Sequence, residues 1–231
     1  MRHERLEADP LFAGFYTNAE AARILGLDGT RKVRGWLNGW PSSRSGPIVA
    51  RDFKDSSTVS FLDLMEMRFI EYFRSQGVSM QTLRKAAAMA RKEWEREHPF
   101  ALSQATYLTD RRKIFAQVAK EEGDRITWDM ASGQHEIWEA IEQAVARGVQ
   151  FRPKTDLACR WHPKPGDFPT IMVDPRYAYG RPVVEPVGVP TAALFRHWKA
   201  EKGDRERVAE WFNLPPEDVR TAVDFELQIA V

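Results

Sequence analysis

The chain has a single cysteine, Cys159, in 231 residues. One cysteine excludes an intramolecular disulfide and any zinc site built from several cysteines. An excess of charge of one sign is also missing. The 34 Lys and Arg residues stand against 33 Asp and Glu residues, for a net charge of +1, which excludes a uniformly basic nucleic-acid-binding coat. No apolar run approaches the roughly 18 residues of a membrane helix, and the opening stretch lacks a hydrophobic signal core. The sequence therefore predicts a soluble, cytoplasmic protein.

Catalytic and phosphate-binding motifs are missing as well. The sequence contains no G-x-G-x-x-G, G-x-x-x-x-G-K-[ST], G-x-S-x-G or H-E-x-x-H motif. Cys159 and His162 have the spacing of metal ligands, but two ligands are fewer than a zinc site uses. His135 and Glu139 could share a helix face, but nothing near them completes a triad. We therefore expect a protein that is not an enzyme, with no cofactor and no metal.

The sequence contains enough apolar residues to form hydrophobic cores, and its charge is distributed unevenly along the chain. Hydrophobic residues make up 43% of the chain, with 8 tryptophans and 13 phenylalanines. Proline-bearing breaks after His98 and Pro165 divide the chain into three parts. Residues 1–98 carry a net charge of +3, residues 99–165 of +1 and residues 166–231 of −3. A basic front and an acidic back indicate two different partners.

The first part has the signals of two short helices joined by a glycine-bearing turn. Thr17 to Glu20 is a capping box, and Gly26 can end the helix that it opens. Thr30 can begin a second helix, on which Arg31, Arg34 and Asn38 share one face. Such a pair is typical of a helix-turn-helix, although a plain helical pair gives the same pattern.

The residues that follow predict a β-hairpin wing and two further helices. The short apolar pieces 48–50 and 59–61 flank a polar turn, as the strands of a wing would. Ser60 to Asp63 is another capping signature, and Ser79 can begin one more helix that runs through Leu83 to Trp94.

The motifs of residues 15–95 resemble a MerR-type winged helix-turn-helix. The motifs are Phe15-Tyr16-Thr17-x-x-Glu20-Ala21-Ala22-x-x-Leu25-Gly26, Val33-x-x-Trp36-Leu37, Phe61-x-Asp63-Leu64-x-x-Met67-x-x-Ile70 and Gly77-Val78-Ser79-x-x-x-Leu83-Arg84. The resemblance implies a DNA-binding domain over 1–98. On the expected helix face, helix start and wing we assign base and phosphate contacts to Arg31, Lys32, Arg34, Asn38, Arg44, Arg51 and Lys54.

The middle part, 99–165, predicts a small α+β module. Residues 106–109 and 113–118, around the polar turn 110–112, indicate a β-hairpin, and 125–130 indicate a third strand. Apolar residues four apart predict an amphipathic helix over 133–147. Residues 149–152 and 157–161 predict two more strands.

The last part, 166–231, predicts a three-helix domain with helices over 191–200, 204–212 and 216–228. Asp174, placed before Pro175, is expected to fix a turn through its own backbone. The last helix carries four acidic residues and a single basic residue, so we do not expect it to read DNA, although its shape is that of a helix-turn-helix. The overall fold class expected is α+β, mainly helical.

The motifs of residues 169–228 resemble a small domain of uncharacterised function found in bacterial antitoxins of the VapB type. The motifs are Val173-Asp174-Pro175, Gly180-Arg181-Pro182-Val183, Val189-Pro190-Thr191, Val208-Ala209-x-x-Phe212 and Leu214-x-x-x-Asp218-Val219-x-x-Ala222. The chain departs from the family's pattern at 185–188.

The resemblance implies the antitoxin of a type II toxin–antitoxin system that neutralises a PIN-like ribonuclease and autorepresses its operon by binding operator DNA. It implies a homodimer or a toxin–antitoxin hetero-oligomer and no membrane partner. Arg181, Trp198 and Trp211 are the candidate contacts to the toxin. Two alternatives stay open: a MerR-like transcription regulator without a toxin, which senses a small molecule or only dimerises, and a structural adaptor that does not bind DNA.

Overall fold

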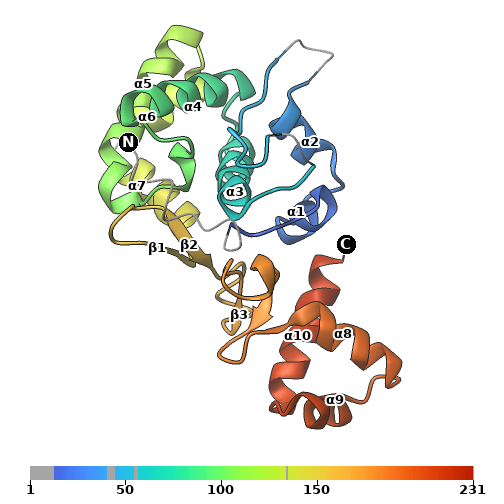
Figure 1. The fold of residues 1–231 in the computed structure, drawn as a ribbon. Helices are drawn as coiled ribbons and strands as arrows, with labels where there is room; N and C mark the ends of the chain where they lie inside the picture. Colours follow the sequence, from blue (N-terminus) through green and yellow to red (C-terminus); the bar gives the residue numbers. More distant parts are fainter. Residues whose placement is uncertain (1–12, 41–44, 55–56, 134, 231) are drawn as a thin grey trace.

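The computed structural model describes residues 13–40, 45–54, 57–133 and 135–230, and it is mainly helical with two small antiparallel sheets (Figure 1). In the larger body lie α1 (Asn18–Ile24), α2 (Arg31–Asn38), α3 (Phe61–Ser75), α4 (Met80–Trp94), η3 (Pro99–Ala101), α5 (Gln104–Glu122), α6 (Arg125–Ser132), α7 (His135–Ala146), β1 (Val149–Phe151) and β2 (Ala158–Trp161). The remainder is β3 (Ile171–Met172), η4 (Ala178–Gly180), β4 (Val183–Val184), β5 (Val189–Pro190), α8 (Thr191–Ala200), α9 (Arg205–Phe212) and α10 (Pro216–Ile229). The expected class, α+β and mainly helical, agrees with this architecture.

The helix starts predicted from capping residues are largely confirmed. Thr17 accepts a hydrogen bond from the amide of Glu20, and Glu20 accepts one from the amide of Thr17. The same reciprocal pair joins Ser60 and Asp63 at the start of α3. α2 begins directly after Thr30, as predicted, but the side chain of Thr30 makes no capping hydrogen bond.

The predicted pairing of a wing between 48–50 and 59–61 is wrong for the described residues. Val59 instead pairs with Tyr16, and the amide of each residue donates to the carbonyl of the other. The amides of Ile48 and Val49 both donate to the carbonyl of Trp36. Ile48 and Val49 are buried, and burial against α2 replaces a partner strand.

The hairpin and third strand predicted for the middle part are also wrong, because this stretch forms α5 and α6. Phe115, Val118 and Ala119 are buried along one face of α5, a spacing that fits a helix. The expected turn 110–112 lies inside α5, where Arg111 is buried and pairs with Glu142 of α7. The helix predicted over 133–147 and the two strands after it are confirmed as α7, β1 and β2.

Two hydrophobic cores hold the chain together. The larger core includes buried residues from Tyr16 to Val173 and runs across residue 98 without a break. Its centre is a group of aromatic rings from α3, η3, α5 and α7, formed by Phe69, Phe73, Phe100, Phe115 and Trp138. The smaller core, between 171 and 229, lies under α8, α9 and α10, which form the lobe at one end of Figure 1.

Within the described residues, no helix combines the length and apolar character needed to cross a membrane.

Candidate functional site

The exposed face of α2 carries the long polar side chains that the sequence assigned to DNA. Arg31, Lys32, Arg34 and Asn38 are exposed, while Val33, Gly35, Trp36 and Leu37 are buried. The burial of one face against the core fixes the direction of the other, so the arginines point outward together. The helix is therefore built like one that presents hydrogen-bond donors to a partner.

Arg31 is supported by a tryptophan that packs under the helix. Its guanidinium lies 5.6 Å from the ring centre of Trp40, a cation–π distance. The ring of Trp40 lies so close to α2 that a Cβ added at Gly35 would come within 2.2 Å of it. Glycine at position 35 is thus what allows Trp40 to pack beneath Arg31.

We expect Gly35→Ala to destabilise the protein, although alanine is the better helix former by about 1 kcal/mol. The added methyl group must displace the Trp40 ring, which should shift tryptophan fluorescence to the red and lower the melting temperature. Gly46→Ala is the matched control because a Cβ at that position meets no atom within 4 Å. A Gly35→Ala protein at least as stable as the wild type would contradict this packing.

The other predicted DNA contacts are partly engaged within the chain. Lys32 pairs with Glu71 of α3 at 2.6 Å, and Arg51 donates to the side-chain oxygen of Asn38 at 3.0 Å. Lys54 is exposed two residues beyond Asp52 in the same loop, and Arg44 lies outside the described residues. The structure thus brings Arg51 to α2, and it places Lys32 beside a carboxylate that competes with phosphate.

Two arginines of α4 donate hydrogen bonds to the loop that carries Arg51. The sequence predicted the helix but not these contacts. Arg84 donates to the carbonyl of Gly46 at 3.2 Å, and Arg91 donates to the carbonyl of Ile48. Arg84 belongs to the motif that ends Leu83-Arg84 and Arg91 belongs to none, but neither position indicates a contact with this loop. Only the tertiary structure shows what the two arginines position.

The three residues predicted to contact a partner have different environments. Arg181 pairs with Glu20 of α1 at 3.0 Å. Trp198 is half-buried and stacks on Phe195, with ring centres 5.7 Å apart. Trp211 is 56% exposed, and this exposure makes it the one of the three that presents a large apolar surface outward.

Specific polar contacts join the region of α1 to η4 and to α10. Tyr16 donates to the carbonyl of Gly180 at 2.6 Å, and Arg23 pairs with the buried Glu226 at 2.9 Å. Glu226 also accepts from Thr191. Glu226, counted in the sequence among the acidic residues of the last helix, therefore belongs to an internal contact.

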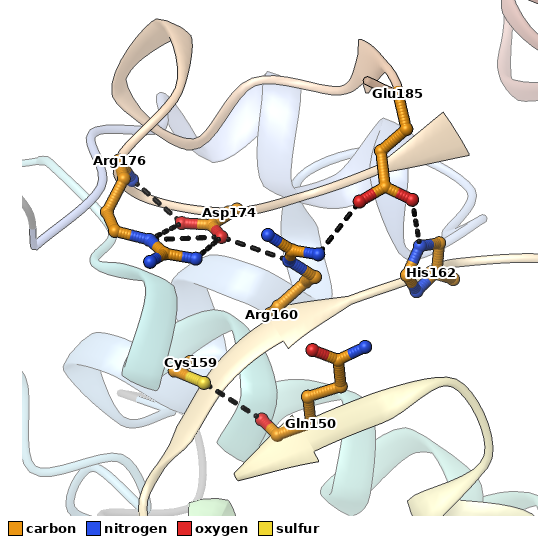
Figure 2. Close-up of polar contacts among 7 residues, drawn as sticks. All are labelled: Gln150, Cys159, Arg160, His162, Asp174, Arg176 and Glu185. Carbon is orange, nitrogen blue, oxygen red and sulfur yellow. Dashed lines mark hydrogen bonds and ion pairs between the residues drawn. The ribbon is translucent and has the colours of Figure 1, made fainter. Parts of the chain in front are cut away.

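A second network joins β2 to the β3–β4 segment (Figure 2). Asp174, with a side chain 0% exposed, accepts from Arg160 at 3.1 Å and from Arg176 at 2.6 Å. Glu185 accepts from Arg160 at 2.8 Å and pairs with His162 at 3.1 Å. Burial alone would raise the pKa of Asp174, but hydrogen bonds from Arg176 and Arg160 outweigh it and lower that pKa below its usual value.

Two features singled out in the sequence, Asp174 and the Cys159–His162 pair, have their contacts in and beside this network. Asp174 accepts from the amide of Arg176 at 3.0 Å, which confirms that it fixes the turn after Pro175. Cys159 donates to the carbonyl of Gln150, while His162 faces Glu185 (Figure 2). The two side chains of the Cys159–His162 pair thus have separate partners.

The chain is similar to known proteins over most of its length. No family model matches. The chain is 24% identical over 229 residues to the protein named "Putative antitoxin VapB45" of Mycobacterium tuberculosis, covering 90% of this chain and 92% of that protein. It is also similar to the X-ray crystal structure of Rv2018 from Mycobacterium tuberculosis, with 25% identity, a TM-score of 0.66 and coverage of 90% and 96%. The similarity therefore spans all three parts of the chain, and it supports an antitoxin role.

Proposed function

We propose that the protein is the antitoxin of a type II toxin–antitoxin pair that neutralises a PIN-like ribonuclease and binds its own operator DNA. The observation that carries the proposal is the similarity to a named VapB antitoxin along nine-tenths of the chain. Because this similarity includes both the basic first part and the acidic last part, both halves of the function are proposed together.

The DNA-binding half is assigned to α2 and the loop that follows it. In this proposal Arg31 and Arg34 read base edges in the major groove, since arginine pairs with guanine through two hydrogen bonds. Arg51 and Lys54 contact phosphates and fix the register of the helix. A single unit of this size binds weakly, so a dimer that reads two half-sites is expected.

The toxin-binding half is assigned to the lobe of α8, α9 and α10. Trp211 is exposed, with the guanidinium of Arg207 5.8 Å from its ring centre and His197 edge-on at 5.8 Å. Exposed tryptophan flanked by polar groups is typical of the centre of a protein interface. The first turn of α10 carries the acidic residues Glu217 and Asp218. Because these carboxylates repel phosphates, they disfavour DNA as the partner of this lobe.

We expect Trp211→Ala to weaken toxin binding by roughly 30-fold or more, because truncating a central interface tryptophan costs about 2–4 kcal/mol. The test is co-expression of the antitoxin with the toxin encoded beside it, read as growth rescue, together with the affinity of the purified pair. Growth arrest in cells that hold normal amounts of the Trp211→Ala protein is the expected result.

The matched control is Trp128→Ala, since Trp128 of α6 is 39% exposed and lies outside the lobe. It should rescue growth like the wild type. Full rescue by Trp211→Ala together with failure of Trp128→Ala would move the toxin surface to the central helices.

A cavity gives specific support to the alternative of a small-molecule-sensing regulator. It has a volume of about 320 Å³, within the range of ligand sites, and it lies where the three parts of the chain meet. Its lining includes Ile24, Arg68, Tyr72, Trp161, Lys164 and Ile229. A genomic neighbourhood without a toxin gene would favour this alternative.

A further inference from the structure

A cluster of acidic side chains surrounds His98, between the loop that carries Arg51 and Lys54 and the start of α3. Asp52 comes from the loop, Asp63 and Glu66 from the first two turns of α3, and His98 from the segment before η3. A ring nitrogen of His98 lies 3.0 Å from an oxygen of Asp52, and the other ring nitrogen lies 4.0 Å from Asp63 and 3.6 Å from Glu66. One ligand atom each from Asp52, Asp63 and His98 lie within 4.8 Å of one another.

Several atoms of this cluster have no hydrogen-bond partner among the described residues. They are Oδ1 of Asp63, Oε2 of Glu66 and Nδ1 of His98, on side chains that are 0%, 0% and 5% exposed. Buried polar atoms are normally satisfied, because an unsatisfied one costs about 1–3 kcal/mol. Nδ1 of His98 and Oδ1 of Asp63 face each other across 4.0 Å, which is too long for a hydrogen bond. Two ligands that each lie about 2.1 Å from one ion are at most about 4.2 Å apart, so Nδ1 and Oδ1 are spaced to share an ion. Asp52, which lies beside Nε2, has to turn toward the same ion to join them.

The charges around His98 also leave room for a dication. Three carboxylates meet there, and the guanidinium of Arg91 lies 3.6 Å from Glu66. With a neutral imidazole the cluster therefore carries two uncompensated negative charges, and buried charge needs compensation.

We propose that His98, Asp52 and Asp63 bind one divalent transition-metal ion of the zinc type, with Glu66 beside it as a charge-balancing carboxylate. One imidazole and two carboxylates form a ligand set that suits such ions, and three protein ligands leave a position for water. Asp52 is 36% exposed and gives the ion a path from solvent. The ion would tie the loop of Arg51 and Lys54 to α3 and to the segment before η3.

The test uses the full-length protein, stripped with a chelator, dialysed and titrated with Zn²⁺. We expect one Zn²⁺ per chain by elemental analysis and calorimetry, with proton release because the imidazole must be neutral to bind. The melting temperature should rise by on the order of 5 °C with saturating Zn²⁺, and Mg²⁺ should not replace it.

Two variants and one control locate the ion. Asp52→Asn keeps the shape of a partly exposed side chain and removes its charge, and His98→Gln removes the nitrogen ligand. Each should lower the affinity for Zn²⁺ by at least about 10-fold. His162→Gln removes the histidine near Cys159 and should leave binding unchanged. A wild-type protein that takes up no Zn²⁺ overturns the proposal, as does binding that Asp52→Asn leaves intact or that His162→Gln abolishes.

Discussion

Replacing Arg31 and Arg34 together by alanine is expected to weaken binding of the DNA upstream of the gene by at least about 30-fold. Each arginine that reads a base through two hydrogen bonds contributes about 1–3 kcal/mol of discrimination, and about 1.4 kcal/mol is a factor of ten. Both side chains are on the exposed face of α2, and neither side chain contributes to the hydrophobic core. The fold should therefore be retained, although the contact between Arg31 and Trp40 is lost. The measurement is fluorescence anisotropy at a fixed salt concentration with operator and scrambled duplexes.

The matched control removes the same charge at positions far from α2. Arg125→Ala/Arg220→Ala replaces two exposed arginines whose pairs are with neighbours on their own helices, Asp129 and Glu217. It should bind the operator nearly as well as the wild type, because long-range charge is screened within about 10 Å at 0.1 M salt. Equal losses in the two double variants would show that net charge, and not α2, carries the affinity.

The helices that could be predicted from the sequence are those whose ends are fixed by residues close to them in the chain. The capping boxes at Thr17 and Ser60 and the proline at the start of α10 each fix a helix terminus through neighbours a few residues away. The error in α5 arose because Asp110, Arg111 and Arg112 form a polar run that is typical of a turn. Arg111 is instead buried by its pairing with Glu142, a residue distant in sequence, and no local pattern contains that information.

The residues of the candidate site also fall into a group that the sequence could predict and a group that it could not. The outward face of α2 follows from helical spacing alone, so Arg31 and Arg34 could be assigned in advance. The pairing of Arg181 with Glu20 and the stacking of Trp198 on Phe195 depend on how distant segments pack. The acidic cluster of His98 was missed for the same reason, because its members come from a loop, α3 and the segment before η3 without a motif spacing.

Asp174→Ala is expected to lower the free energy of unfolding by about 3 kcal/mol. The carboxylate is fully buried and accepts from the side chains of Arg160 and Arg176 as well as from the amide of Arg176. Hydrogen bonds to charged groups contribute about 1.5–3 kcal/mol each, and Arg160 keeps Glu185 as a partner in the variant. For a chain of this size the melting temperature should fall by roughly 6–12 °C. Asp129→Ala is the control because it changes an exposed carboxylate 3.8 Å from Arg125, and it should leave the melting temperature unchanged.

The acid dependence of stability separates this charge network from simple loss of packing. The pKa of Asp174 is lower in the folded protein than its usual value, so its carboxylate stabilises the fold at pH values above the unfolded-state pKa. That contribution is lost as the pH falls through the folded-state pKa, where the carboxylate takes up a proton. The difference in stability between the wild type and Asp174→Asn, which keeps the shape of the side chain, should therefore be largest near neutral pH and shrink as the solution is acidified. A difference that stays constant from pH 7 down to the acid transition would mean that Asp174 acts through its shape and not through its charge.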